Sequence, residues 1–150
     1  MSERTTRYLF FSTAAIVIFM LIFNGFAVLA QIRIGGKSFA ESLNHTVHYS
    51  VVQPVGTLIS FFPFAAVTWI CASLAKESRG RAIWLMAICL ALFALMYYFG
   101  QINSQKFMQQ HLWTAATLSV GLIPFKSIPI VILAFVLRFV WGRNHGPTAA

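Results

Sequence analysis

The sequence has very little charge for its length and contains no aspartate. Charged residues make up 9% of its 150 positions, and its only acidic residues are Glu3, Glu41 and Glu77. A soluble domain carries charge on about a quarter of its residues. So few charges cannot cover a soluble fold. The shortage of carboxylates also argues against Ser-His-Asp hydrolases and against antiporters that depend on a membrane carboxylate.

The motifs of other enzyme classes are missing as well. The two cysteines, Cys71 and Cys89, form no C-x-x-C pair, which disfavours thiol–disulfide chemistry. No glycine-rich phosphate-binding motif occurs, and none of the four histidines stands in a long apolar run where it could bind haem. We therefore expect a protein that is not an enzyme and that holds no cofactor.

Long apolar runs dominate what is present. Hydrophobic residues make up 59% of the chain, and about 20 of them in a helix suffice to cross roughly 30 Å of hydrocarbon. The sequence predicts an all-α integral membrane protein with four transmembrane helices, at residues 8–30, 51–75, 82–100 and 112–141. These helices would form a single four-helix bundle over residues 1–150. The first run is too long for a signal-peptide core, so we expect it to be retained.

The last apolar region is too long for one straight crossing, because 30 helical residues span about 45 Å. Pro124 and Pro129 predict a break near residues 124–129, since proline removes a helical hydrogen bond and clashes with the preceding turn. Lys126 lies inside this break. Either its side chain extends to the outer interface as an anchor, or it faces the bundle interior and binds there. Lys126, Pro124 and Pro129 are the candidate binding residues.

Lysine and arginine are distributed unequally between the two ends of the predicted helices. Three stand at one end, Arg33, Lys37 and Lys106; seven stand at the other, Arg4, Arg7, Lys76, Arg79, Arg81, Arg138 and Arg143. Cytoplasmic loops are rich in these residues, so the counts predict both termini in the cytoplasm. We expect the chain to lie in the plasma (inner) membrane. The net charge of +8 is explained by this bias and by anionic lipid head groups, without a nucleic-acid partner.

The outer loop after the first crossing predicts a short amphipathic helix at about residues 39–50. Ser38 and Glu41 match a capping box, and Phe39, Leu43 and Val47 recur at helical spacing. Such a helix lies in the outer interface with its apolar stripe toward the lipid. The second outer loop, GQINSQKFMQQHLW (residues 100–113), has a similar character. Together the two stretches predict a structured cap over the outer end of the bundle.

The polar face of the first outer helix carries candidate metal ligands. Glu41, His45 and His48 fall within about 60° of one another at 100° per residue. A carboxylate and two imidazoles are the ingredients of a metal site, and His111 is the remaining outer histidine that could complete it. A solvated polar face accounts for the same residues, and we favour that interpretation.

The layout of four helices with both termini inside is shared by small drug exporters, sugar-lipid flippase partners, bacteriocin immunity proteins and accessory subunits. Topology alone does not carry function, and the missing membrane carboxylate disfavours an exporter. We expect a protein that acts by binding, as an accessory or immunity-type component of a larger membrane complex. Its partners would be the bilayer and another integral membrane protein or further copies of itself. The alternative is a small transporter or lipid-handling protein that uses the broken fourth helix around Lys126.

Overall fold

The structure, a computed structural model, describes residues 3–52 and 54–143, and this part of the chain is helical without a strand. Four segments are long and apolar enough to cross a membrane, which confirms the predicted all-α membrane fold. The helices are, in chain order, α1 (Glu3–Arg33), α2 (Phe39–Val52), α3 (Pro54–Leu74), α4 (Arg79–Gln109), α5 (Trp113–Gly121), α6 (Ile123–Lys126) and α7 (Ile128–Arg143).

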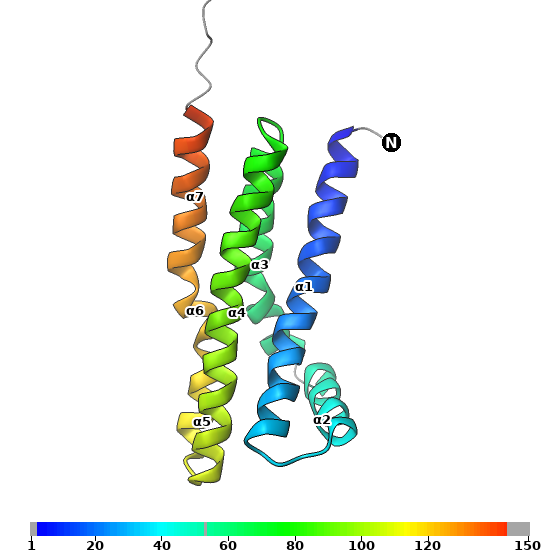
Figure 1. Ribbon diagram of the computed structural model, residues 1–150, viewed down its shortest axis with the longest axis vertical. Helices are drawn as coiled ribbons and strands as arrows, with labels where there is room; N and C mark the ends of the chain where they lie inside the picture. Colours follow the sequence, from blue (N-terminus) through cyan, green and yellow to red (C-terminus); the bar gives the residue numbers. More distant parts are fainter. Residues whose placement is uncertain (1–2, 53, 144–150) are drawn as a thin grey trace, which may run out of the picture.

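The helices α1, α3, α4 and α7 form the bundle. Both α1 and α7 pack against α3 and α4. The start of α1, the turn between α3 and α4, and the end of α7 all lie at the top in Figure 1. The opposite end holds α2 and the turn between α4 and α5. We call the top the inner end and the bottom the outer end, after the sides that the sequence predicts.

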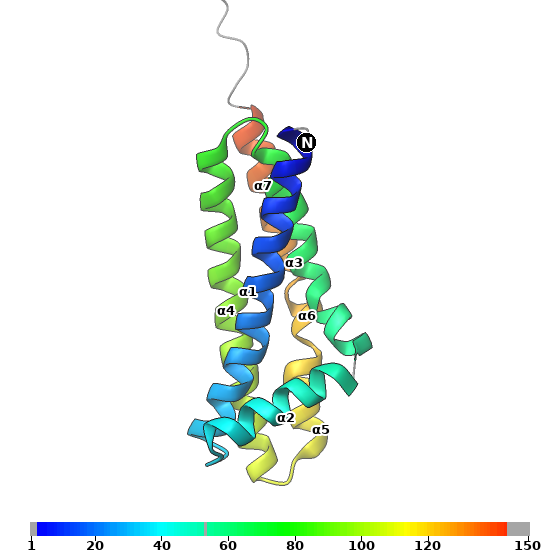
Figure 2. The ribbon, with the colours of Figure 1, turned by 90° about the vertical axis from the view of Figure 1, so that its right-hand side faces the viewer.

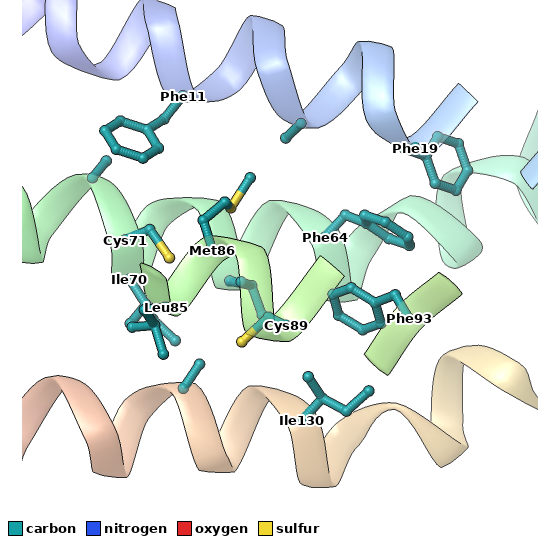
Figure 3. Close-up of a cluster of buried hydrophobic side chains, with 14 of the residues drawn as sticks. Phe11, Phe19, Phe64, Ile70, Cys71, Leu85, Met86, Cys89, Phe93 and Ile130 are labelled. Carbon is teal, nitrogen blue, oxygen red and sulfur yellow. The ribbon is translucent and has the colours of Figure 1, made fainter. Parts of the chain in front are cut away.

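Aromatic and aliphatic side chains from these helices fill the bundle core (Figure 3). The rings of Phe64 on α3 and Phe93 on α4 are stacked with their centroids 4.3 Å apart, and Phe19 of α1 lies edge-on at 5.1 Å from Phe64. Cys71 and Cys89 are buried in the same core as free thiols. Many large apolar side chains point outward instead, as expected where the surrounding solvent is lipid.

Two arginines join the helices at the inner end. Arg81 of α4 donates from Nη1 to the carbonyl oxygen of Trp141 on α7, at 2.8 Å. Arg138 of α7 donates from Nε to the hydroxyl of Ser73 on α3, at 2.6 Å, and lies 3.9 Å from the carboxylate of Glu77. These polar contacts mark the inner limit of the apolar part of the bundle.

The fourth crossing is broken near Pro124 and Pro129, as predicted. Turns at Leu122 and Ser127 separate α5, α6 and α7, so each proline is the second residue of the helix that follows a turn. There its missing N–H removes no helical hydrogen bond. The hydroxyl of Ser127 donates to the carbonyl oxygen of Pro124 at 2.6 Å.

The third crossing is longer than predicted. We expected it to end at residue 100, but α4 continues to Gln109. Residues 101–109 contain neither proline nor glycine, and Gly100 is buried against Ile123 rather than in a turn. The chain reverses only at residues 110–112, where His111 has a left-handed φ of 58°. The second outer stretch is therefore mostly a helical extension of α4 beyond the membrane core.

Candidate functional site

A cavity of about 330 Å³ lies at the outer end of the bundle. All of α1 to α6 contribute to its wall, and α2 crosses the lower part of α1 beside it (Figure 2). Gln101, in the wall, stands 20 residues after Arg81, which is about 30 Å along α4. This distance equals the thickness of the hydrocarbon, so the cavity lies where the outer head groups meet the acyl chains.

Gln31 connects α1 to α2 at the wall of this cavity. Its Nε2 donates to the hydroxyl of Thr46 at 3.2 Å and lies 3.5 Å from Nδ1 of His45. The Oε1 atom of the same carboxamide is buried and has no hydrogen-bond partner. The Nε2 atom of Gln31 therefore holds α2 in place, and the Oε1 atom is left without a hydrogen bond.

Most of the wall is apolar, but it carries several polar side chains and no fixed charge, because none of its residues is lysine, arginine, aspartate or glutamate. Its polar groups gather toward the outer end. Gln101, Ser104 and Gln105 of α4 stand there, together with Gln31 and Thr46. Farther in, the wall is apolar, with Phe23, Val120 and Phe125 among its residues. The cavity is therefore amphipathic along the membrane normal.

The cavity opens sideways, between α2 and α3 on one side and α5 and α6 on the other. Tyr49 and Ile59 line it from the first side, and Thr117 and Phe125 from the second. All four of these residues are exposed, so the rim faces the surroundings of the bundle. We call this rim the lateral opening.

The structure places Lys126 outside this cavity. Its side chain is exposed on α6 and lines a separate groove of about 570 Å³ between α4 and α5. Apolar residues such as Leu95, Phe99 and Leu122 form most of this groove, and Asn103 stands toward its outer end. Of the other two candidate binding residues, Pro124 is buried and lines the cavity, whereas Pro129 is exposed on α7.

The four candidate metal ligands do not come together. Within residues 3–52 and 54–143, no group of three or more His, Cys, Asp or Glu side chains could hold a metal ion. Glu41, His45 and His48 are all exposed on α2, and His45 turns toward Gln31. His111 is in the turn after α4, where its ring lies edge-on to Trp113 at 6.1 Å.

Most residues that line the cavity were not predicted as site residues, and of the candidates only His45 and Pro124 are in its wall. Gln31 and Gln101 each end a long apolar run, and we had given both to loops. For α2, the sequence pattern predicted only an apolar face and a charged face. Its third face, Ser42 and Thr46, is the one buried toward α1. The small polar residues Ser42, Thr46 and Ser50 are spaced four apart. Since residues four apart share a helix face, this spacing could have predicted the buried polar face.

Pro63 was not predicted as a feature of this site either. It stands in the middle of α3 and is buried, and proline there removes the hydrogen bond to the carbonyl of Ile59, four residues earlier. Ile59 and Ser60 both line the cavity. A proline in the interior of a predicted crossing could therefore have pointed to this level of the bundle.

The arrangement is suited to binding an uncharged molecule through hydrogen bonds. No pair of acid and base groups faces the cavity. No protein-family model matches the sequence, and no curated protein or solved structure shows significant similarity to it.

Proposed function

We propose that this protein acts by binding rather than catalysis, as an accessory or immunity-type component of a larger complex in a bacterial-type plasma membrane. The observation that carries this proposal is the apolar stripe of α2. Phe39, Leu43 and Val47 are 65%, 41% and 49% exposed, while the polar residues Ser42 and Thr46 face the bundle. The amphipathic helix thus turns its apolar side away from its own chain.

The height of this stripe favours a protein partner. The apolar crossing of α1, Tyr8–Arg33, has 26 residues and spans about 39 Å, which exceeds the hydrocarbon by about 9 Å. The chain then turns at residues 34–38 before α2 begins, so Phe39, at the start of the stripe, lies at the level of the outer head groups or beyond it. An apolar stripe at that height is best covered by another integral membrane protein that also projects from the bilayer.

The distribution of charge supports cytoplasmic termini. Lys76, Arg79 and Arg81 stand at the end of the bundle where α1 begins and α7 ends (Figure 1). Arg33, Lys37 and Lys106 stand at the other. Arg4 and Arg7 on α1, and Arg138 and Arg143 on α7, belong to the first end. The end where α1 begins and α7 ends therefore has seven basic residues against three, the excess that is typical of the cytoplasmic side.

The test is the mass of the chain extracted from its own membrane in mild detergent. We expect a complex heavier than the chain alone, and we expect the double variant Leu43→Gln, Val47→Gln to run alone. The matched control is His48→Gln, on the polar face of the same helix, which should keep the complex. A wild-type chain that is monomeric under these conditions would contradict the proposal, and a multiple of its own mass would identify a homo-oligomer.

Lipid handling is the second candidate, and the placement of Lys126 favours it. An exposed cation at the side of an apolar groove that faces lipid has the chemistry to hold a phosphate head group, with an acyl chain along Leu95 and Phe99. A retained anionic phospholipid that Lys126→Gln releases would support this function over the first.

A further inference from the structure

We propose that the outer cavity binds the uncharged, hydroxyl-bearing head group of a lipid, which enters from the outer leaflet through the lateral opening. This inference does not rest on a protein partner. The stripe of Phe39, Leu43 and Val47 is on the outside of α2, whereas the cavity lies between the helices.

Buried polar groups without partners indicate that a ligand belongs in the cavity. Gln31, Thr46, Gln101 and Ser104 line it and are only 5%, 4%, 8% and 5% exposed. The Oε1 atom of Gln31 is buried and has no partner, and leaving such an atom unpaired is unfavourable. Within the described part of the chain the side chains of Gln101 and Ser104 form no hydrogen bond, and their polar atoms remain accessible at the cavity. These groups are therefore available to a molecule with several hydrogen-bonding groups.

The chemistry of the wall selects an uncharged ligand. The wall has no lysine, arginine, aspartate or glutamate, and its one imidazole, His45, lies 3.5 Å from Nε2 of Gln31. A phosphate, a carboxylate or an ammonium group would therefore lose its hydration without gaining a fixed counter-charge. Carboxamides and hydroxyls both donate and accept, and so do the hydroxyls of a sugar or a glycerol. Because Oε1 of Gln31 is buried, it would reach a ligand hydroxyl by rotation about the last torsion of the glutamine, which is soft.

The shape of the cavity favours a lipid over a free solute. Its polar groups lie at the level of the outer head groups, and its inner wall is apolar, with Phe23, Val120 and Phe125. Ile59 and Phe125 are on the lateral opening and are exposed, so acyl chains can rest against them while the head group enters. A free sugar would match the outer half of the cavity and leave the inner half unfilled.

Two glycines allow a substitution that narrows the cavity and a matched control outside it. Gly121 of α5 lines the cavity, and a Cβ added there meets no other atom within 4 Å. Gly121 is exposed at the cavity wall, so the side chain in Gly121→Leu would add bulk at the cavity without a clash at its base. Gly25 of α1 has equally open surroundings but is not in the cavity wall, so Gly25→Leu is the matched control.

The experiment measures lipid retained by the purified protein. Nanodiscs of phosphatidylcholine would contain a small fraction of monoglucosyl-diacylglycerol, or the same fraction of phosphatidylglycerol, and the bound lipids would be counted by native mass spectrometry. We expect the wild-type chain and Gly25→Leu to retain the glucosyl lipid over both phospholipids. We expect Gly121→Leu to retain about tenfold less, and excess free glucose not to displace the lipid.

Three results would overturn the inference. Equal retention of the glucosyl lipid by Gly121→Leu and Gly25→Leu would show that the lipid binds elsewhere. Preference for phosphatidylglycerol would show that charge decides the selection. Displacement by free glucose would make this a solute site. If Gly121→Leu does not fold, Gln101→Leu replaces it, because it keeps the size of the side chain and removes only hydrogen-bonding groups. Unchanged retention by that variant would also overturn the inference.

Discussion

The carboxamide of Gln31 donates a hydrogen bond to the hydroxyl of Thr46 at 3.2 Å, and this contact attaches α2 to the outer end of α1. Both residues are buried. A second contact farther along the same pair of helices supports it, because the hydroxyl of Ser50 donates to Oδ1 of Asn24 at 3.1 Å. Polar contacts, rather than its apolar stripe, thus hold α2 to the bundle.

Substitution of two neighbouring residues on α2 tests this contact. Thr46→Val keeps the shape of the side chain but leaves Nε2 of Gln31 without its acceptor, so we expect the free energy of unfolding to fall by about 1–2 kcal/mol. Ser42 is the control, because its buried hydroxyl has no partner. Ser42→Ala should leave the stability unchanged or raise it. Unfolding by SDS in mixed micelles, followed by circular dichroism, would compare the two. Equal losses would contradict this account.

How far the sequence predicts this fold depends on which physical signal each element carries. The four crossings follow from hydropathy, because the lipid requires long apolar helices whatever their neighbours are. The break at Pro124 and Pro129 follows from the covalent structure of proline. The predicted end of the third crossing, at residue 100, was wrong. In the sequence Gly100 resembles the end of a helix, but in the structure it is a point of close contact between helices.

The cavity could not be predicted in the same way. Its wall combines residues from six helices, and none of Gln31, Gln101 and Ser104 is informative alone. Their common position depends on the height at which each helix crosses the membrane. Glu41, His45 and His48 were predicted on one face of α2; all three are exposed on this helix, and they form no group of metal ligands within the described residues. His111 is a separate case, since its place depends on a turn between α4 and α5 that hydropathy does not describe.

Gly100 allows α4 and α5 to pack closely, and its substitution tests that packing. A Cβ at this position would lie 2.5 Å from Cδ1 of Ile123 and 3.1 Å from the carbonyl oxygen of Ser119. The Ile123 methyl can move, but the Ser119 backbone moves only with α5. We expect Gly100→Ala to lower the free energy of unfolding by about 1–3 kcal/mol, measured in the same micelles. Gly25→Ala, with open surroundings, should have no such cost, and equal effects would disprove the close contact.

Labelling with a membrane-impermeant maleimide tests the orientation. The native cysteines are fully buried, so the wild-type chain should stay unlabelled and serve as the background. We expect Asn44→Cys, on the exposed side of α2, to react from outside in intact cells. Gly80→Cys, at the start of α4, should react only after the cells are opened. Both positions are exposed. Reaction of both from the same side would refute the predicted topology.

Substitutions of Lys126 test whether its side chain only anchors the helix at the interface or also binds a lipid at the groove between α4 and α5. It stands 12 residues before Arg138, which places its Cα about 18 Å from the inner end along the helices, in the outer half of the bilayer. Its exposure on the lipid-facing side of α6 allows the ammonium group to extend outward past Asn103 to the head groups. We therefore expect Lys126→Gln to insert and fold as the wild type does, and Lys126→Arg to be neutral. Stability in mixed micelles and the phosphatidylglycerol retained after purification measure the two properties separately. If Lys126→Gln folds normally but loses a phospholipid that Lys126→Arg keeps, the ammonium group binds a phosphate, and lipid handling replaces the accessory role as the function that the structure favours.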